Sequence, residues 1–237
     1  MSGAALEIGR NVYRIPTLGD FINSYAFVDD DGQVCLVDCG LKRAPARIVR
    51  GLAAIGKHPK DVTRIVLTHA HSDHAGGAAK FFASSTASSV LAHHEDAEFL
   101  RAGKVPPRDP TTGLGRLIRR LPTGSFSPVS AVEDLRDGEY LDIAGGLKVI
   151  HTPGHTPGHV SLLHPGSGVL ITGDAIFNMN ARMTWPLSAF CTSYTQTKKT
   201  AHLLADEDYC TAAFTHGPEI RDSGREAIRS FLRRRSS

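Results

Sequence analysis

Six consecutive residues of the 237-residue chain include four side chains of the types that bind metal ions. His69, His71, Asp73 and His74 lie in a segment that reads Thr-His-Ala-His-Ser-Asp-His-Ala-Gly-Gly. In an extended turn His69 and His71 point the same way, while Asp73 and His74 turn toward a second point as a helix begins. One short loop can therefore offer ligands to two metal ions. Any of these histidines alone could be an ordinary core or surface residue, but the four residues together favour a metal site.

Three more candidate ligands follow apolar, strand-like runs. His155, Asp174 and His216 come just after the runs at residues 149–151, 170–172 and 213–215. Each is flanked by glycine or proline, which marks the point where a strand gives way to a turn. Ligand sites gather at strand ends, where loops held by a rigid scaffold converge. We therefore expect one site that pools five histidines and two aspartates.

The elements that must position these residues form two successive sets of strands and helices. The apolar patterns and turn residues predict strands at 11–15, 24–28, 34–38, 64–67, 90–92, 140–142, 147–151, 160–163, 169–172 and 212–215. They predict helices at 46–55, 75–82, from about 95, 195–204 and 223–235. Mixed elements of this kind indicate an α/β protein in which helices cover both outer faces of a two-sheet core.

Residues 103–128 differ in composition from the rest and contain five prolines. The segment is interpreted as an insertion with one short amphipathic helix, whose apolar face consists of Leu114, Leu117, Ile118 and Leu121. It could form a lid over the site, or face an acyl chain, a membrane surface or another subunit. The plainer alternative is a helix that docks on the body with its arginines in solvent.

Composition places the chain among ordinary folded proteins. Hydrophobic residues make up 41% and charged residues 22%, which predicts a single domain over residues 1–237. A net charge of +3 is too small to indicate nucleic-acid binding. The four cysteines form no Cys-x-x-Cys pair, which is typical of reduced thiols. Glu7 and Arg10 interrupt the segment that a signal peptide would need, and the sequence has no apolar run long enough to cross a membrane, so we expect a cytoplasmic protein.

The combined motifs resemble those of the metallo-β-lactamase superfamily. The matching segments are His-x-His-x-Asp-His at 69–74, Thr-Pro-Gly-His at 152–155, Thr-Gly-Asp at 172–174, His-Gly-Pro at 216–218 and Leu-Val-Asp-Cys-Gly at 36–40. They occur in the family's order and cover nearly the whole chain. The resemblance implies an αββα four-layer sandwich, in which two mixed sheets are flanked by helices and the site lies between the sheet edges.

The resemblance also implies roles for the candidate residues. One metal ion would be held by His69, His71 and His155, the second by Asp73, His74 and His216, and Asp174 would bridge both. A donor set of nitrogen and oxygen suits two divalent ions, zinc first, with iron or manganese as alternatives. Metal-bound hydroxide would be the nucleophile, and Asp73 would orient it or pass its proton to the leaving group. Asp38 would accept a ring N–H from a ligand histidine. His159 would have a similar supporting role, or none beyond the start of a strand.

Departures from family patterns favour one reaction class. Asp174 stands where β-lactamases of this fold carry Cys or Ser, and only 21 residues follow His216, too few for the helical glutathione-binding region of hydroxyacylglutathione hydrolases. Residues 180–184 lack the Gly-Arg-x-Asp segment of the thiol-sulfur dioxygenases. The sequence therefore predicts a hydrolase of a small-molecule lactone or carboxylic ester. The alternatives are a thioester or phosphodiester hydrolase, a mononuclear iron dioxygenase acting on a persulfide, and a metal-stabilised binding protein without turnover. The chain could act as a homodimer.

Substrate contacts are predicted from position alone. Tyr194 could donate a hydrogen bond to the substrate carbonyl, as in some lactonases of this fold, or pack beside a helix that Ser193 caps. Asn178 and Trp185 lie on the segment after Asp174 and are expected to line the entrance, although Trp185 could equally belong to the core. Thr215 stands where the family usually has glycine and is expected to narrow the pocket slightly.

Overall fold

The computed structural model describes residues 4–118 and 124–236, which form two β-sheets packed face to face. The seven-stranded sheet contains, in spatial order, β1 (Leu6–Gly9), β2 (Val12–Pro16), β3 (Asn23–Val28), β4 (Val34–Val37), β5 (Val62–Val66), β6 (Val90–His93) and β7 (Val132–Leu135). The five-stranded sheet has the order β14 (Thr211–Ala213), β11 (Val169–Ile171), β10 (Val160–His164), β9 (Leu147–His151) and β8 (Tyr140–Leu141). A separate hairpin joins β12 (Phe177–Met179) to β13 (Arg182–Thr184).

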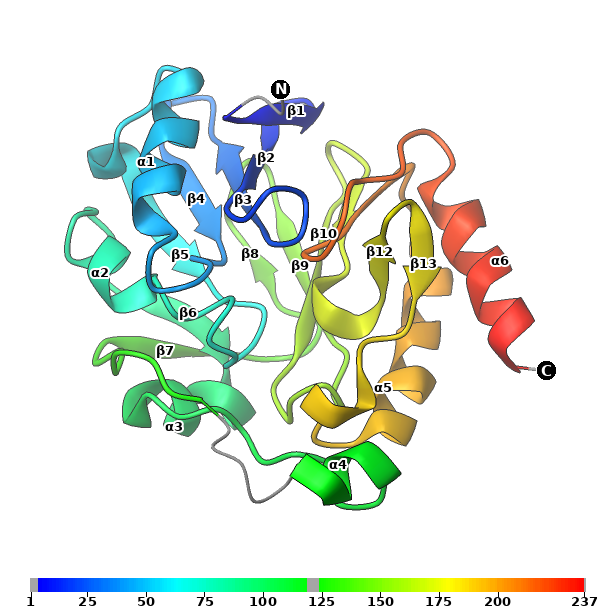
Figure 1. Ribbon diagram of the computed structural model, residues 1–237. Coiled ribbons are helices and arrows are strands. Elements are labelled where there is room, and N and C mark those ends of the chain that lie inside the picture. Colours follow the sequence, from blue (N-terminus) through cyan, green and yellow to red (C-terminus); the bar gives the residue numbers. More distant parts are fainter. Residues whose placement is uncertain (1–3, 119–123, 237) are drawn as a thin grey trace.

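Helices cover the outer face of each sheet (Figure 1). On the first sheet lie α1 (Pro45–Ala54), α2 (Ala78–Phe82) and α3 (His94–Ala102). On the second lie α5 (Tyr194–Thr200), the 3-10 helix η4 (Ala201–Ala205) and α6 (Gly224–Ser236). The shorter elements are α4 (Gly113–Ile118) and the 3-10 helices η1 (Pro59–Asp61), η2 (Gly173–Ala175) and η3 (Ser188–Phe190). The layers follow the order helix, sheet, sheet, helix, which confirms the αββα sandwich.

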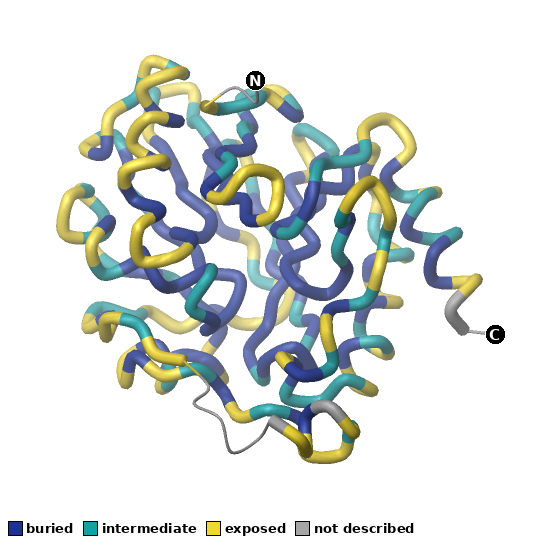
Figure 2. Tube along the Cα trace, in the orientation of Figure 1, coloured by how far each residue is buried: buried dark blue, intermediate teal, exposed yellow. Residues whose placement is uncertain are grey.

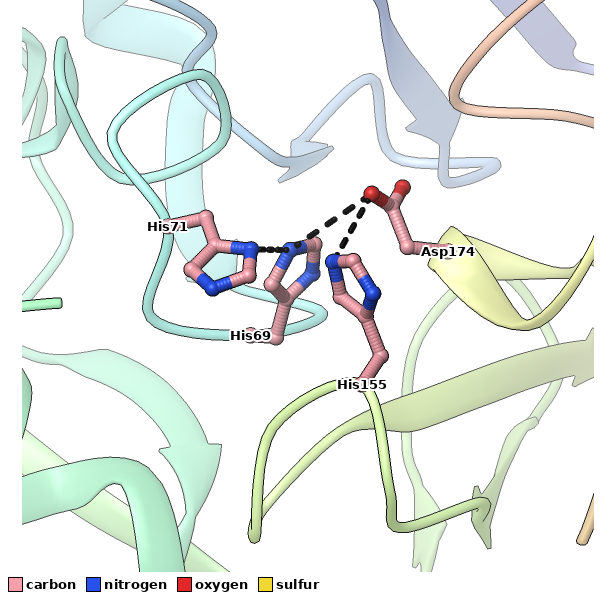
Figure 3. Close-up of side chains that lie close together, drawn as sticks. All are labelled: His69, His71, His155 and Asp174. Atoms are coloured by element: carbon pink, nitrogen blue, oxygen red, sulfur yellow. Dashed lines mark hydrogen bonds and ion pairs between the residues drawn. The ribbon is translucent and has the colours of Figure 1, made fainter. Parts of the chain in front are cut away.

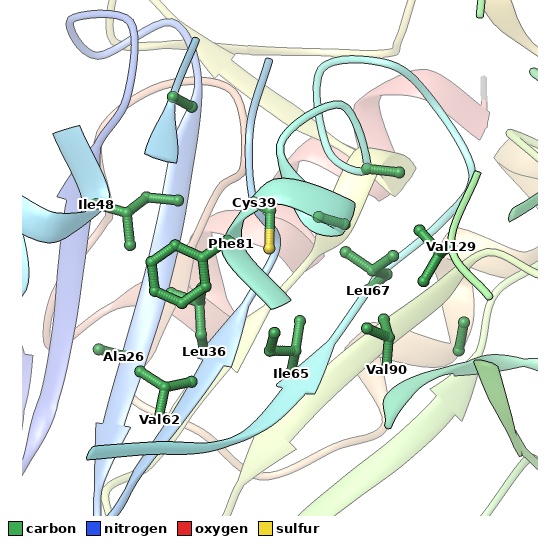
Figure 4. Packing of buried hydrophobic residues seen from close by; sticks show 14 of the residues in the cluster. Ala26, Leu36, Cys39, Ile48, Val62, Ile65, Leu67, Phe81, Val90 and Val129 are labelled. Atoms are coloured by element: carbon green, nitrogen blue, oxygen red, sulfur yellow. The ribbon is translucent and has the colours of Figure 1, made fainter. Parts of the chain in front are cut away.

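Alternation along the strands explains the layers. In β4, Val34 and Leu36 point to the helices, where Ile48 of α1 and Phe81 of α2 cover them (Figure 4). The alternate residues Cys35 and Val37 point to the other sheet and pack in the central cluster with residues of β9 and β10. Because successive side chains of a strand point to opposite faces, a continuous apolar run is what a sheet covered on both sides requires. Figure 2 shows the central strands buried and many of the peripheral segments exposed.

The direction of the strands determines where the candidate ligands lie. Strands β4 to β7 are parallel neighbours, and β11 is parallel to β14, so the carboxyl ends within each group lie at the same edge of a sheet. His69 follows the end of β5. Asp174 and His216 follow the neighbouring ends of β11 and β14.

The predicted strands and helices agree with the structure within a few residues, with specific exceptions. Strand β7 was not predicted because it is short and its two central residues are exposed acids. Strand β1 and the β12–β13 hairpin were also not predicted. The predicted helix at 75–82 begins only at Ala78, after a turn containing Gly76 and Gly77, and the predicted helix at 195–204 changes to a 3-10 helix at Ala201.

The predicted insertion is described in part. Helix α4 forms within it and packs against η3, while Leu117 of α4 is 78% exposed. Residues 119–123, with Leu121 of the predicted apolar face, lie outside the described residues. Within the described ranges, no helix combines the length and apolar character needed to cross a membrane.

Candidate metal centre

Four strand ends deliver the predicted ligands to one place between the sheets. The loop after β5 carries His69, His71, Asp73 and His74, and the other three ligands follow β9, β11 and β14. All seven predicted ligands fall into two adjoining groups. Within each group, one ligand atom from every residue lies within 4.8 Å of the others.

The first group contains His69, His71, His155 and Asp174, all buried (Figure 3). His69 Nε2 lies 3.1 Å from His71 Nδ1. Oδ2 of Asp174 lies 3.0 Å from His155 Nε2 and 3.8 Å from His69 Nε2. Three imidazoles and one carboxylate therefore face a common point.

The second group contains Asp73, His74 and His216. His74 Nε2 lies 3.3 Å from His216 Nε2, and Asp73 Oδ2 lies 3.4 Å from the same His216 nitrogen. Asp174 is also close, with Oδ1 3.3 Å from His74 Nε2 and Oδ2 3.3 Å from His216 Nε2. Asp174 thus lies between the two groups, as a bridging ligand would.

The donor set fits divalent metal ions. Two pairs of imidazole nitrogens point at one another at 3.1 and 3.3 Å, and each pair can share no more than one proton between its facing atoms. His155 Nε2 is buried without a hydrogen-bond partner, since its approach to Asp174 lacks hydrogen-bond geometry. A buried polar nitrogen of this kind is costly unless a metal ion or a hydrogen-bond partner satisfies it. Nitrogen and oxygen donors without a thiolate match zinc, iron or manganese.

Without a metal, burial and the neighbouring carboxylates and imidazoles set the charge state of each residue in the cluster. Burial lowers the pKa of His69 and of His71 well below the usual value, so both rings are neutral and able to bind a cation. Burial acts in the same direction on His155, but the Asp174 carboxylate outweighs it and raises the pKa of His155 to about 10. Burial opposes ionisation of Asp174 as well, yet the surrounding imidazoles, His216 first, hold the pKa of Asp174 well below its usual range.

Asp38 orients two ligand rings. It accepts from His74 Nδ1 at 2.8 Å and from the Thr68 hydroxyl at 2.8 Å. Because the only proton of that hydroxyl goes to Asp38, Thr68 Oγ1 accepts from His69 Nδ1 at 3.0 Å. A proton on Nδ1 leaves Nε2 of both rings free to bind a metal. Asp38 itself has a φ of +59°, a left-handed conformation that Asp tolerates better than most residues.

Two residues hold Asp174. His159 Nε2 accepts from the Asp174 backbone N–H at 2.7 Å, while His159 Nδ1 donates to Thr152 O at 3.0 Å. Thr215 Oγ1 donates to Asp174 Oδ1 at 2.7 Å. His159 therefore lies directly behind a candidate ligand. The predicted effect of Thr215 was only a narrower pocket, whereas its hydroxyl contacts the carboxylate.

Asp96 of α3 joins two ligand loops and was not singled out in the sequence. Its buried carboxylate accepts three hydrogen bonds of 2.7 Å, from Ala70 N, Thr156 Oγ1 and Gly158 N. Ala70 lies between His69 and His71, and Thr156 follows His155. A Cβ on Gly158 would lie 2.5 Å from Asp96 N, so glycine is needed for this approach. In sequence, Asp96 resembles the acidic residues common in a first helical turn, which hides its role.

Cys191 supports the remaining side of His155. The buried Sγ lies 3.5 Å from His155 Nδ1 and 3.6 Å from Leu187 O. The ring N–H donates to sulfur and the thiol donates to the carbonyl, which again leaves His155 Nε2 free. The sequence indicated only that the cysteines are reduced.

An opening of about 450 Å³ leads to the cluster. His71, Asp73, His155, Asp174 and His216 line its base. Its walls include parts of two connecting segments, residues 105–108 of the predicted insertion and residues 177–190 after Asp174. The size falls in the range of small-molecule sites.

The three predicted substrate contacts do not line this opening. Tyr194 N donates to Asp109 Oδ2 at 2.8 Å, and Lys198 Nζ lies 4.9 Å from the centre of the Tyr194 ring. Trp185 packs against Phe231 of α6, with ring centres 4.8 Å apart. Asn178 is buried and donates to Pro218 O at 2.8 Å, and its backbone N–H donates to His216 O at 2.9 Å. Asn178 thus positions the His216 turn, and Ser193 is the N-cap of α5.

Comparisons with known proteins identify one family and several relatives. The family model described as the metallo-beta-lactamase superfamily matches residues 18–229. An uncharacterized protein of Bacillus subtilis, YobT, is 30% identical over 224 residues and covers 90% of each chain. An N-acyl homoserine lactonase of a Bacillus species is 30% identical, over 55% of this chain and 45% of its own.

Two further matches are a relative with a different named activity and a solved structure. The hydroxyacylglutathione hydrolase GloC of Haemophilus influenzae is 26% identical over 70% of this chain and 72% of its own. Among solved structures, a metallo-beta-lactamase family protein of Thermus thermophilus, TTHA1429, has a TM-score of 0.73 and 27% identity. That match covers 96% of this chain and 80% of that one.

Proposed function

The chain belongs to the metallo-β-lactamase superfamily of metal-dependent hydrolases, and we propose that it cleaves a lactone or carboxylic ester of a small molecule. One observation carries the proposal: two groups of ligands, with Asp174 between them, lie at the base of an opening of small-molecule size. That arrangement fits an attack by activated water better than attack by a side-chain nucleophile.

We assign the ligands by their grouping. His69, His71 and His155 would hold one ion, Asp73, His74 and His216 would hold the other, and Asp174 would contribute to both. Zinc is the first candidate for this donor set, and iron or manganese would also bind it. Bound there, two divalent ions would supply a water molecule of lowered pKa and would polarise the oxygen of the bond under attack.

Asp73 is the residue proposed to move the proton. Its side chain is 30% exposed and lines the opening, whereas the side chain of Asp174 is almost fully buried. Burial opposes ionisation of Asp73, but the neighbouring His74 and a hydrogen bond from His216 hold its pKa below the usual range. It therefore remains a carboxylate at neutral pH, able to take a proton from water and release it to the leaving oxygen.

The relatives support ester-type chemistry and leave two substrate classes in view. One is named a lactonase and one a hydroxyacylglutathione hydrolase, which acts on a thioester. Of the ten residues in the described ranges that line the opening outside the cluster, Ser72 and Arg108 are polar and the remaining eight are apolar. Such walls suit a lactone or simple ester better than a charged glutathione conjugate. Thioester hydrolysis is the second candidate.

The test is a substrate panel combined with metal analysis. Protein prepared with zinc, manganese or iron would be assayed on a γ-lactone, a p-nitrophenyl ester, S-lactoylglutathione, a phosphodiester and a β-lactam. We expect two ions per chain and the highest kcat/KM on the lactone or ester. A single iron with oxygen uptake on glutathione persulfide would instead identify an oxidoreductase. Full metal content with no turnover on any of these would favour a binding protein.

A further inference from the structure

The walls of the opening are apolar over most of their surface. Six of the wall residues are Leu41, Val105, Phe177, Met179, Leu187 and Phe190. They come from three separate parts of the chain: the turn before α1, the segment after α3, and the segment after Asp174. Three separate segments thus contribute apolar side chains to the walls of the same opening.

Three of these side chains face solvent. Leu41 is 38% exposed, Phe190 50% and Leu187 59%. Single exposed leucines are common, but several large apolar side chains around one mouth form a patch of the kind that marks a binding site. Their exposure to water is unfavourable in the free protein, and a bound apolar group would relieve it.

We propose that this opening binds the hydrophobic substituent of the substrate, so that the preferred substrate is a lactone or ester with a neutral alkyl or acyl chain of medium length. The inference rests on the proposed hydrolytic function. The reacting bond would lie at the base, near Asp73 and His216, and the chain would extend along Leu41, Leu187 and Phe190. A volume of about 450 Å³ equals roughly fifteen water volumes. This is room for a five-membered lactone ring with a chain of about six carbons.

A charged thioester fits these walls less well. Glutathione carries two carboxylates and one ammonium group, which need charged or hydrogen-bonding partners. Among the described wall residues, the polar side chains are those of Ser72 and Arg108. Charges left against the leucine and phenylalanine side chains would lose their hydration without replacement. The apolar walls thus favour neutral substrates over glutathione thioesters.

A series of γ-lactones tests the proposal on the metal-loaded enzyme. We expect kcat/KM to rise about two- to fourfold for each added methylene from γ-butyrolactone to γ-decalactone, because each buried methylene contributes to binding. A flat or falling series among hydrolysed lactones would overturn the inference and leave the proposed function standing.

Variants of the rim add a matched comparison. Leu187→Asn and Phe190→Ser should each reduce the ratio of kcat/KM for γ-decalactone to that for γ-butyrolactone by about three- to tenfold. Leu203→Asn is the control, because Leu203 is 46% exposed on η4 and does not line the opening. An equal ratio in the Leu187, Phe190 and Leu203 variants would contradict the assignment of these walls.

A binding measurement separates the inference from the proposed function. The neutral fluorescent probe N-phenyl-1-naphthylamine should bind the protein, and γ-decalactone should displace it at a concentration at least tenfold below that of γ-butyrolactone. This displacement would support the apolar site even if no lactone or ester were hydrolysed, in which case the proposed function alone would fail. Equal displacement by both lactones from the parent protein would count against the site, as would displacement by γ-decalactone that is unchanged in the Phe190→Ser variant.

Discussion

Thr215 donates a hydrogen bond of 2.7 Å to Oδ1 of Asp174, the carboxylate that lies within 4 Å of four histidines. The bond is buried and fixes the rotation of the carboxylate between the two ligand groups. A glycine at this position, which the family resemblance led us to expect, would leave Asp174 held through its backbone by His159 alone. Asp174 is thus oriented at its side chain as well as at its main chain.

Thr215→Val should weaken metal binding. Valine keeps the branched shape but removes the donor, and loss of a hydrogen bond to a ligand typically costs 10- to 100-fold in metal affinity or activity. Competition with a chromophoric chelator measures the change. Thr211→Val is a matched control, because Thr211 lies buried in β14 without contact to the cluster. Affinities that match in the two variants would argue against a role for the Thr215 hydroxyl.

Asp174→Asn should reduce turnover more than a hundredfold and lower the metal content from two ions toward one. The amide keeps the size of the side chain but removes the negative charge that faces four imidazoles, and a direct ligand contributes more than the supporting contacts do. Elemental analysis of the purified variant gives the stoichiometry. Two ions per chain together with full activity would exclude the bridging assignment.

Asp96→Asn should loosen both ligand loops. The two carboxylate oxygens of Asp96 accept from different backbone N–H groups, those of Ala70 and Gly158. Asparagine has one carbonyl oxygen, so in either orientation its NH2 group would face one of these donors. We expect about 10- to 100-fold weaker metal binding with a smaller change in kcat once metal is saturating. Thr156→Val removes one of the three hydrogen bonds and serves as the milder variant if Asp96→Asn fails to fold. Asp142→Asn, at an exposed site, is the control. Unchanged metal affinity in both the Asp96 and Thr156 variants would reduce Asp96 to an ordinary core residue.

Removal of metal should lower the melting temperature. The loop after β5 belongs to one sheet, whereas His155, Asp174 and His216 follow strands of the other, so bound ions connect both. An ion present at 1,000 times its Kd stabilises the fold by about 4 kcal/mol, which corresponds to roughly 10 °C for a chain of this size. Calorimetry with and without EDTA measures the difference. A melting temperature that does not change after verified metal removal would contradict this coupling.

The buried His93 predicts a loss of stability in acid. His93 is 2% exposed, and its ring stacks on His151 at 3.8 Å. Burial first, and then the neighbouring imidazoles of His151 and His94, lower the pKa of His93 to about 4. The unfolded chain, with a histidine pKa near 6.5, takes up the proton first as pH falls. The neutral His93 therefore costs no stability above pH 6.5. Between pH 6.5 and about 4 the free energy of unfolding falls by up to about 1.4 kcal/mol per pH unit.

His93→Asn isolates this proton. Asparagine can still cap α3, as the His93 ring does by accepting from Glu95 N, but it does not titrate. In urea unfolding at pH 7, 6 and 5, the free energy of unfolding should fall less steeply with decreasing pH in this variant than in the parent protein. His58→Asn is the control, since His58 is an exposed cap of η1 and tests the exchange of cap residues alone. The same slope in the His93 variant and the parent would disprove the assignment.

The sequence predicted the cluster well because its signals are local. The His69–His74 motif contains four of the candidate ligands, and the other three each follow an apolar run that forms a strand. Strand direction then brings them together without further information. The αββα layers likewise follow from strands that are apolar on both faces.

The supporting contacts were harder to predict because they depend on packing between distant segments. Asp96 meets Gly158 across 62 positions, and Thr215 meets Asp174 across 41. The ring of Trp185 packs against α6. The hydrophobic character of Trp185 was consistent with this core position and equally with a position at the entrance of the site. Strand β7 has an acidic exposed face, so its apolar pattern was too weak to recognise.

The walls of the opening and the metal ligands are carried by different parts of the chain. Ligands lie at the ends of sheet strands, whereas much of the wall surface comes from the connecting segments 105–108 and 177–190. Insertions, deletions or exchanges in those segments can change the choice of substrate while the candidate ligands at the strand ends stay in place. Homologous enzymes can thus diverge in specificity by loop replacement, and grafting these two segments from a relative is a direct route to redesigning this one.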